Sequence, residues 1–192
     1  RIGFDYLYAG CGYGGSCLPK DVRALQKTGQ DYGFPLKILS AVEQVNEDQK
    51  YLLLKKIIEY FNNDLVGKHF AIWGLAFKSG TDDMREAVSR EVIEGLWACG
   101  STVSAYDSVA MNESKYIYGE RADLIYANSA QDALKNADAL IILTDWEGFK
   151  NYNFQRDKSK FNNLVIFDGR NLYELSDINL LGFEYFSIGR NN

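Results

Sequence analysis

Short, continuously apolar segments recur from residue 69 to the end of the chain, and amphipathic segments separate them. The apolar segments are residues 69–74, 101–106, 137–144, 163–168 and 183–188. A strand that is apolar on both faces is typical of a parallel sheet, because helices cover both sides of such a sheet. The pattern therefore predicts an α/β fold with one parallel sheet, and the amphipathic segments predict helices over residues 86–99 and 130–136.

The first third of the chain has a different texture. Residues 1–18 are rich in glycine and tyrosine and predict a loop, whereas residues 19–62 carry helical patterns. One of these patterns, ending at Phe61, predicts a helix of about 25 residues, or roughly 38 Å. A helix so long and so apolar exceeds what one small domain buries, so we expect self-association through residues 19–62. The texture changes near residue 66, which predicts a helical segment over residues 1–66 and a sheet domain over residues 67–192.

Composition limits the possible partners. With 21 basic against 26 acidic residues, the net charge of −5 supplies no positive field for nucleic acid. No apolar run reaches the roughly 18 residues of a membrane helix, and no signal peptide opens the chain at Arg1, so we expect neither membrane insertion nor export. Three cysteines and the single His69 have no metal-type spacing, which favours a reduced, cytoplasmic setting without a metal site.

A glycine-rich segment precedes the first helical pattern. Gly10, Gly12 and Gly15 formally satisfy the dinucleotide fingerprint, but no apolar strand precedes them and no helix follows directly. A second interpretation centres on Cys17, which lies just before a helix N-terminus and three residues from Lys20. Both features stabilise a thiolate, as an activated nucleophile requires. The alternative is an inert, buried thiol beside a tight turn.

The three cysteines are expected to differ in reactivity. Cys17 is expected to react fastest with iodoacetamide, because of its helix N-terminus and Lys20. Cys99 lies late in a helical pattern among apolar residues and is expected to react slowest. Cys11 is expected to fall between them.

Charged residues follow several of the predicted strands. Ligands bind at the carboxyl ends of strands in open α/β sheets, so Lys78, Arg85 and Arg170 are candidates for holding phosphates or another anion. The alternatives are a solvated loop with an Asp or Thr helix cap for the first two, and a surface arginine in a turn for Arg170. Asp107 matches a ribose-binding position, but without the glycine fingerprint an acid that ends the strand is favoured.

An ordered set of motifs runs through almost the whole chain. The motifs are Arg1-Ile2-Gly3, Gly12-Tyr13-Gly14-Gly15-Ser16-Cys17, Gly74-Leu75-Ala76-Phe77-Lys78, Thr81-Asp82-Asp83-Met84-Arg85, Ala137-Asp138-Ala139, Asp168-Gly169-Arg170-Asn171 and Ser187-Ile188-Gly189-Arg190. This set resembles the UDP-glucose 6-dehydrogenases of the UDP-glucose/GDP-mannose dehydrogenase family. Family members have an NAD-binding domain, a central helical dimerisation domain and a Rossmann-like UDP-binding domain. The resemblance implies that this chain holds the last two.

The resemblance also implies a chemistry. The family oxidises the C6 alcohol of UDP-glucose to UDP-glucuronate with two NAD+, through a thiohemiacetal and a thioester on a cysteine. Cys17 matches that nucleophile and Asp21 matches an acid that assists hydrolysis, while Lys20 and Arg85 match residues at the cofactor. The matched substrate contacts are Arg1, Tyr6, Leu7, Tyr8, Tyr13, Gly14, Phe77, Lys78 and Arg170. Arg1 matches an arginine that reaches the neighbouring subunit's site, which implies a homodimer or a higher homo-oligomer.

Other interpretations keep part of this picture. Leu18 is closer to the GDP-mannose dehydrogenases, so GDP-mannose or a UDP-N-acetylhexosamine are alternative substrates. A nucleotide-sugar binding or dimerisation module without catalysis is a further alternative. The family's catalytic lysine and asparagine, its first-domain glutamate and its nicotinamide fingerprint would all precede Arg1. The 192 residues alone are therefore expected to be inactive.

Overall fold

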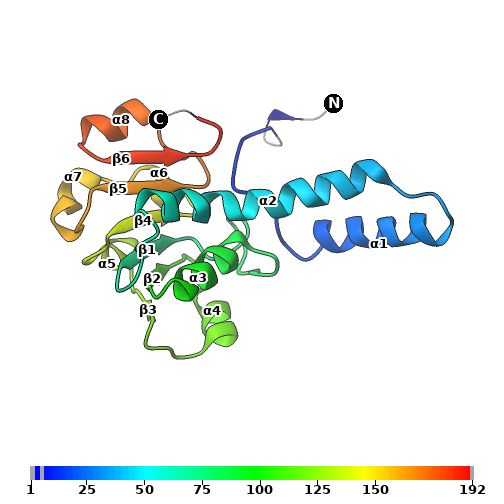
Figure 1. The fold of residues 1–192 in the computed structure, drawn as a ribbon. Helices are drawn as coiled ribbons and strands as arrows, with labels where there is room; N and C mark the ends of the chain where they lie inside the picture. Colours follow the sequence, from blue (N-terminus) through cyan, green and yellow to red (C-terminus); the bar gives the residue numbers. More distant parts are fainter. Residues whose placement is uncertain (1–2, 5–6, 191–192) are drawn as a thin grey trace.

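A computed structural model describes residues 3–4 and 7–190 of the chain. Six strands form one parallel sheet in the order β3-β2-β1-β4-β5-β6 (Figure 1). The strands are β1 His69–Trp73, β2 Thr102–Tyr106, β3 Leu124–Tyr126, β4 Ala139–Ile142, β5 Val165–Asp168 and β6 Glu184–Ser187. The predicted parallel α/β fold is confirmed. This strand order is Rossmann-like, and it reverses direction between β1 and β4, where such sheets bind ligands.

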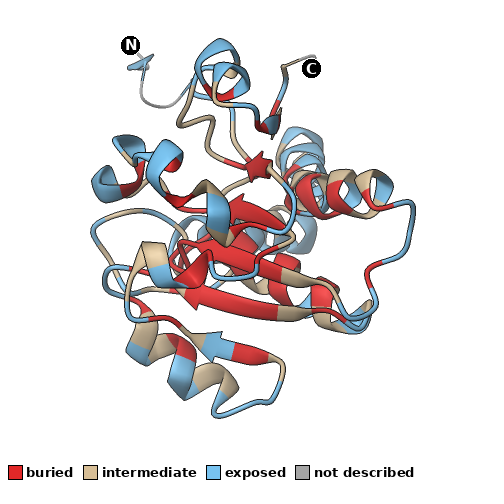
Figure 2. Cartoon of the chain, turned by 90° about the vertical axis from the view of Figure 1, so that its left-hand side faces the viewer, coloured by how far each residue is buried: buried red, intermediate tan, exposed pale blue. Residues whose placement is uncertain are grey.

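Helices cover both faces of the sheet. They are α1 Leu18–Asp31, α2 Lys37–Tyr60, α3 Val88–Ala98, α4 Met111–Tyr118, α5 Ala130–Ala133, α6 Glu147–Lys150, α7 Phe154–Asp157, the 3-10 turn Lys158–Lys160, and α8 Leu175–Leu180. Side chains of β1 alternate between two hydrophobic clusters: Phe70 and Ile72 face one, Ala71 and Trp73 the other. All four are buried, as the red central strands of Figure 2 show. The apolar runs are therefore continuous because both faces of the sheet are covered.

The long helix α2 joins two parts of the molecule. Its 24 residues confirm the predicted long helix. Leu53, Leu54 and Ile57 in its second half are buried against the sheet cluster, and Leu54 packs so closely on α3 that a Cβ at Gly95 would lie 2.2 Å from its Cδ2 atom. Its first half projects with α1 as a hairpin away from the sheet (Figure 1). One helix thus runs from the hairpin into the core of the sheet, and a domain boundary near residue 66 stays a prediction.

Some predicted element bounds differ from the structure. The helix predicted from residue 86 begins at Val88, because Glu86 takes a left-handed backbone conformation with φ of 54°. The helix predicted over residues 130–136 ends at Ala133 and is followed by Asn136, whose φ is 59°. Within residues 3–4 and 7–190, no helix combines the length and the apolar character that crossing a membrane demands.

Candidate functional site

An open cavity of about 600 Å³ lies at the carboxyl ends of β1, β4 and β5. Its lining comprises Tyr8, Ala9, Gly10, Phe77, Lys78, Asp145, Lys150, Arg170, Asn171 and Leu172. We call it the strand-end cleft. It confirms that Lys78 and Arg170 share one edge of the sheet, at the point where the strand order reverses.

Arg170 ties three segments together beneath this cleft. Its Nε atom donates to the Leu143 carbonyl at 2.8 Å, and its two terminal nitrogens donate to the carbonyls of Gly12 at 3.4 Å and Phe77 at 3.1 Å. The alternative of a plain surface arginine in a turn is therefore wrong. A guanidinium has five N–H donors, so two remain for an anion in the cleft.

Two buried carboxylates shape the loops that follow the strands. Asp107 after β2 accepts the amides of Leu75 and Ala76 at 2.7 and 3.2 Å and the indole N–H of Trp146 at 3.0 Å. Asp168 at the end of β5 accepts the Arg170 amide at 2.8 Å, and burial raises the pKa of this carboxyl. The interpretation of Asp107 as an acid that ends its strand is confirmed.

The glycine-rich loop packs against the chain itself. A Cβ at Gly14 would lie 2.1 Å from the Glu86 carbonyl oxygen, and one at Gly15 would lie 2.8 Å from the Phe77 ring. The Gly15 amide donates to the Arg85 carbonyl at 2.8 Å, and the φ of Gly15 is 91°. No helix begins directly after Gly15, since α1 starts at Leu18. These glycines thus permit close packing of the loop, and the loop is not a dinucleotide fingerprint.

Polar side chains on one face of α2 hold this loop. The Asn46 carboxamide accepts the Tyr13 amide at 2.8 Å and donates to the Tyr13 carbonyl at 3.1 Å. The Gln49 carboxamide donates to the Gly10 carbonyl at 2.7 Å. We call Asn46 and Gln49 the loop clamp. The sequence analysis missed both residues, although their three-residue spacing on one helix face was an available signal.

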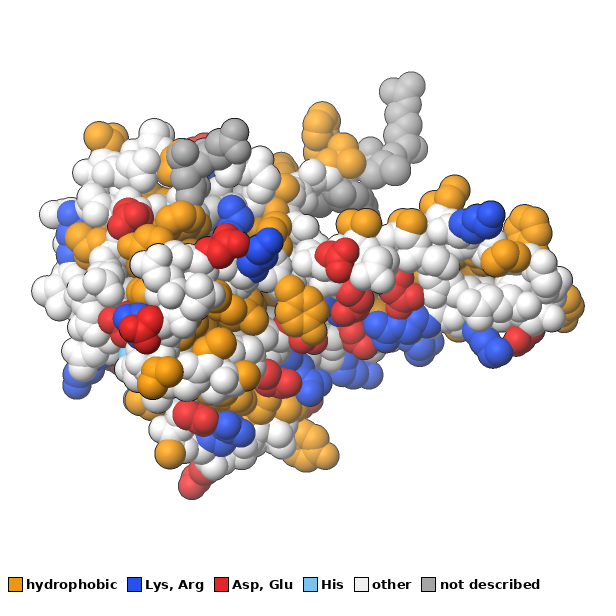
Figure 3. All heavy atoms as spheres, viewed as in Figure 1, with side chains coloured by type: hydrophobic (Ala, Val, Ile, Leu, Met, Phe, Trp, Pro, Cys, Tyr) orange, Lys and Arg blue, Asp and Glu red, His pale blue; other side chains and the backbone are white. Residues whose placement is uncertain are grey.

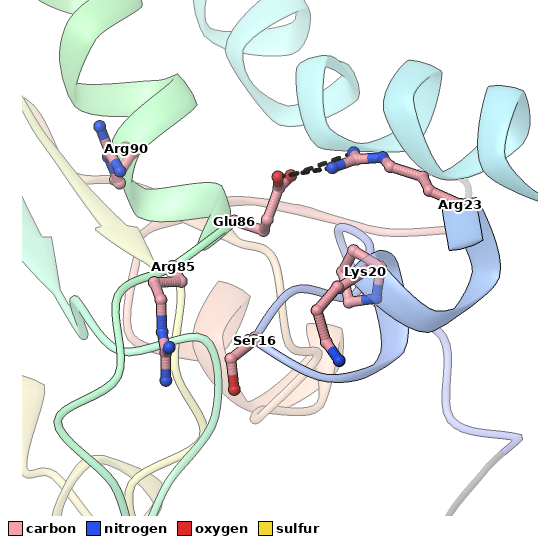
Figure 4. A pocket seen from close by; sticks show the side chains of 8 residues that line it. Ser16, Lys20, Arg23, Arg85, Glu86 and Arg90 are labelled. Atoms are coloured by element: carbon pink, nitrogen blue, oxygen red, sulfur yellow. Dashed lines mark hydrogen bonds and ion pairs between the residues drawn. The ribbon is translucent and has the colours of Figure 1, made fainter. Parts of the chain in front are cut away.

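An ion network around one buried lysine lies beside the loop clamp. Lys50, with a side chain 1% exposed, contacts Glu47 at 2.9 Å and Glu86 at 3.0 Å. Glu86 also contacts Arg23 of α1 at 2.9 Å, the interaction dashed in Figure 4. Arg23 first and Lys50 second hold the pKa of Glu86 at about 2. The network fastens the hairpin to the segment that precedes α3.

Cys17 is exposed and occupies the position just before α1, as predicted. Its Sγ atom lies 3.6 Å from the Ser16 hydroxyl. A cavity of about 400 Å³ opens beside Ser16 and is lined by Gly15, Ser16, Pro19, Lys20, Arg23, Arg85, Glu86 and Arg90. In Figure 4 the side chains of Ser16, Lys20 and Arg85 point toward the same side of this space, which we call the basic cavity.

The predicted charged residues near Cys17 are engaged with one another. Lys20 contacts Asp21 at 2.8 Å, and this hydrogen bond raises the pKa of Lys20. Arg85 donates twice to Asp83, both at 2.9 Å, which lowers the pKa of Asp83. All of the residues suggested for catalysis or cofactor contact thus lie around the basic cavity or at the start of α1.

The cysteines rank differently in exposure from what the sequence indicated. Cys17 is exposed, Cys99 is half-buried and Cys11 is fully buried. Cys11 packs on β5's following turn, where a Cβ at Gly169 would lie 2.7 Å from its sulfur. Burial raises the pKa of the Cys11 thiol. The expected intermediate reactivity of Cys11 is therefore wrong in its physical basis, and Cys11 is the most protected of the three.

The remaining suggested substrate contacts fall into two groups. Leu7 and Tyr8 are exposed, and Tyr8 lines the strand-end cleft. Arg1 and Tyr6 lie outside the described residues. No trio of His, Cys, Asp or Glu side chains in the described part of the chain is arranged to hold a metal ion.

Two family models match the chain. The UDP binding domain of the UDP-glucose/GDP-mannose dehydrogenase family matches residues 71–175, and the central domain of the same family matches residues 1–48. The chain is 44% identical to the UDP-glucose 6-dehydrogenase of Pseudomonas aeruginosa, over 99% of this chain and 43% of that protein. It is 40% identical to the UDP-glucose 6-dehydrogenase of Rhizobium meliloti, over 99% of this chain and 43% of that protein.

The fold has a solved counterpart. A UDP-glucose dehydrogenase from the hyperthermophilic archaeon Pyrobaculum islandicum superposes with a TM-score of 0.81 at 31% identity, covering 98% of this chain and 40% of that one. The chain thus spans less than half the length of the relatives it matches.

Proposed function

Because the chain belongs to the UDP-glucose/GDP-mannose dehydrogenase family, we propose that it forms the central and UDP-binding parts of a UDP-glucose 6-dehydrogenase. The observation that carries this proposal is one loop that joins two sites. Gly10 lines the strand-end cleft, and Cys17 ends the same loop beside the basic cavity. Residues 1–66 and 67–192 are the proposed central and UDP-binding domains.

The strand-end cleft is the proposed site of the UDP group. Lys78 and the two spare N–H groups of Arg170 supply charge-assisted donors for a diphosphate. Phe77 and Tyr8 supply apolar and aromatic surface in the same cavity. Leu7, Tyr13 and Gly14 belong to the proposed substrate loop, as do Arg1 and Tyr6 outside the described residues.

Cys17 is the proposed nucleophile, because its thiol is exposed at the end of this loop. Oxidation of the C6 alcohol gives an aldehyde, and the thiolate adds to its carbon to form a thiohemiacetal. A second oxidation converts the thiohemiacetal to a thioester. Water, oriented by Asp21, then cleaves the C–S bond, which releases the carboxylate and returns the thiolate. Covalent capture keeps the aldehyde from escaping.

NAD+ is the proposed oxidant, and each of two molecules accepts one hydride when bound. The basic cavity fits the phosphates of such a cofactor, because Lys20 and Arg85 lie on its rim with Arg23 and Arg90 nearby. The proposed role of Lys20 and Arg85 is to hold negative charge beside the Cys17 loop.

A homodimer is the proposed assembly. Ile38, Val42 and Val45 on the projecting half of α2 are 79%, 43% and 65% exposed, and a cavity of about 450 Å³ lies along them. Figure 3 shows hydrophobic side chains along this hairpin. Water-exposed apolar surface of this kind is typical of a protein interface. A second copy seated on α2 would cover it.

Substitutions in the full-length protein that contains this chain test the proposal. We expect Cys17→Ser to abolish acid formation while nucleotide-sugar binding persists, because only the covalent step is lost. We expect Arg170→Ala to weaken UDP-glucose binding roughly tenfold or more, since a charge-assisted contact contributes about 1.5–3 kcal/mol. Acid formation by Cys17→Ser at the wild-type rate would overturn the proposal.

The sugar nucleotide is tested in the same way. Titrations with UDP-glucose, GDP-mannose and UDP-N-acetylglucosamine compare the three candidates directly, and we expect UDP-glucose to bind tightest. Tightest binding of GDP-mannose would favour the second candidate function, to which Leu18 in Ser16-Cys17-Leu18-Pro19 points.

A further inference from the structure

We propose that the loop clamp, Asn46 and Gln49 of α2, sets the position of the Cys17 thiol relative to the nucleotide in the strand-end cleft. Both residues act through the glycine-rich loop and are positioning residues. This inference rests on the proposed function, because it concerns how the nucleophile and the nucleotide site are held in one geometry.

The loop spans two sites and is held at a point near each. Gly10 lines the strand-end cleft, and its carbonyl accepts from Gln49 at 2.7 Å. Tyr13 lies nearer to Cys17 along the chain, and both its amide and its carbonyl bond to Asn46. Asn46 and Gln49 are about one turn apart on a rigid helix, so the spacing of the two holding points is determined by helix geometry.

The contact at Asn46 leaves the loop little freedom. The Asn46 side chain is buried, and its carboxamide pairs with Tyr13 as a neighbouring strand would, with one donor and one acceptor. A Cβ at Gly12, whose φ is 100°, would lie 3.0 Å from the Asn46 Oδ1 atom. The Gly12 carbonyl also accepts from Arg170 at 3.4 Å. The loop is thus held between α2 and the arginine beneath the cleft.

The two clamp residues are expected to act on different steps. Gln49 holds the end of the loop that lines the nucleotide cavity, so it is expected to influence affinity. Asn46 holds the end nearer to Cys17, so it is expected to influence turnover. Neither side chain lines the strand-end cleft or the basic cavity. Both line the cavity along Ile38 and Val45 where the second copy is proposed to sit, so the mass of each variant is measured together with its kcat and Kd. A displacement of the thiol by about 1 Å can lower turnover roughly 10²-fold, so a small shift of the loop has a large effect.

The experiment compares Asn46→Ala, Gln49→Ala and Gln44→Ala in the full-length protein. Gln44 is a matched control, because it is an exposed carboxamide on the same helix whose one side-chain hydrogen bond within residues 3–4 and 7–190 goes to Asp48 at 3.0 Å. The measurements are kcat, Kd for UDP-glucose and the thermal unfolding midpoint. We expect Asn46→Ala to lower kcat roughly 10²-fold with little change in Kd. We expect Gln49→Ala to raise Kd several-fold with a smaller change in kcat.

A second pair of variants separates positioning from loss of folding. Asn46→Asp retains the acceptor for the Tyr13 amide but loses the donor to its carbonyl, and Gln49→Glu places an acceptor against the Gly10 carbonyl. Each is expected to show the same split between kcat and Kd as its alanine counterpart. A carboxylate that faces a carbonyl also lowers the unfolding midpoint, so kcat and Kd are compared at a temperature where every variant is fully folded. Wild-type kcat and Kd in all four clamp variants would overturn the inference. The inference would also be overturned if activity and nucleotide binding capacity fell together, in proportion to the fraction of protein that is folded.

Cys17→Ser belongs in the same series, because it separates this inference from the proposed function. If Cys17→Ser forms acid at the wild-type rate, the proposed function fails and the positioning role fails with it. If Cys17→Ser is inactive while the clamp variants behave as wild type, the positioning role alone fails.

Discussion

The sheet and the projecting hairpin use apolar residues in opposite ways. Every residue of β4 and β5 is buried, whereas Ile38 and Val45 on the hairpin are 79% and 65% exposed. Figure 2 shows the buried central strands, and Figure 3 shows hydrophobic side chains along the hairpin. The apolar residues of the sheet are buried by other elements of the same chain. The hairpin is fastened on one side by polar contacts and leaves apolar surface on the other. An apolar helical pattern therefore indicates burial only where another element lies opposite.

Helix α2 contains this contrast within itself. Its second half packs Leu53 and Ile57 against the sheet, and its first half presents Ile38 and Val45 to solvent. Between them, Asn46 and Lys50 face the loop and the ion network. The same helix thus contributes to the core, the loop clamp and the exposed apolar surface.

Truncation of one isoleucine in each region is the strongest test of the contrast. Ile141→Ala removes a fully buried side chain of β4 and is expected to lower the free energy of unfolding by about 2–5 kcal/mol. Ile38→Ala removes a side chain that is mostly in water and is expected to change it by less than about 0.5 kcal/mol. Urea unfolding of dilute protein measures both. Equal losses in the free energy of unfolding would show that Ile38 is as well buried in solution as Ile141.

The ion network holds the hairpin by polar contacts, whereas the sheet core is held by apolar packing. Lys50→Ala removes a buried cation from Glu47 and Glu86 and is expected to cost about 2 kcal/mol, because both carboxylates are more than one-third exposed and Glu86 keeps Arg23. Lys55→Ala is the control, because Lys55 is exposed and lies 3.8 Å from Glu59, and it is expected to cost less than about 1 kcal/mol. The difference is read from urea unfolding midpoints. A similar small loss in both variants would mean that the network does not fasten the hairpin.

Charge on the exposed apolar surface tests whether a second copy covers it. Val45→Asp is expected to weaken self-association at least tenfold, equivalent to about 1.4 kcal/mol, because a carboxylate would enter an apolar interface. Light scattering over a concentration series measures the mass. Gln44→Glu adds the same single negative charge at an exposed carboxamide of the same helix and controls for a general effect of that charge. An unchanged dimer in Val45→Asp would place the interface elsewhere.

The pH dependence of stability isolates the contribution of Glu86. Its folded pKa of about 2 lies below the ordinary value of 4.5, so the charged form stabilises the fold above pH 4.5 and this contribution is lost as pH falls toward 2. Glu86→Gln is therefore expected to be less stable than the wild type near pH 7, by about 1 kcal/mol for this partly exposed group. The difference in free energy of unfolding between the two proteins should fall to zero between pH 4.5 and 2 in urea unfolding experiments. A gap that is constant with pH would remove Glu86 from the network.

The sequence alone predicted five of the six strands and the long helix. Strands buried on both faces leave a nearly continuous apolar signal, so β1, β4 and β5 were anticipated. The more mixed segments of β2 and β6 were anticipated as well. β3 was missed because its three residues, Leu124–Tyr126, are too short a run to stand out in the sequence. Leu25 of α1 is apolar yet 53% exposed, because the hairpin projects from the sheet.

Part of the candidate site was also predictable from the sequence. The placement of Lys78 and Arg170 at one edge of the sheet followed from chain order, because residues after parallel strands share the carboxyl edge. The position of Cys17 before a helix was likewise a local feature. In each case the place of a residue relative to the strand or helix next to it is local, and a sequence records such local order directly.

Only the tertiary structure decided how the loop is held. Asn46 lies 33 residues from Tyr13, Gln49 lies 39 from Gly10, and Lys50 lies 36 from Glu86. Each contact joins segments that are far apart in the sequence and lie side by side only in the folded chain. No local periodicity records such a pairing, because the free energy of a hydrogen bond or an ion pair depends on the distance between its partners in space and not along the chain.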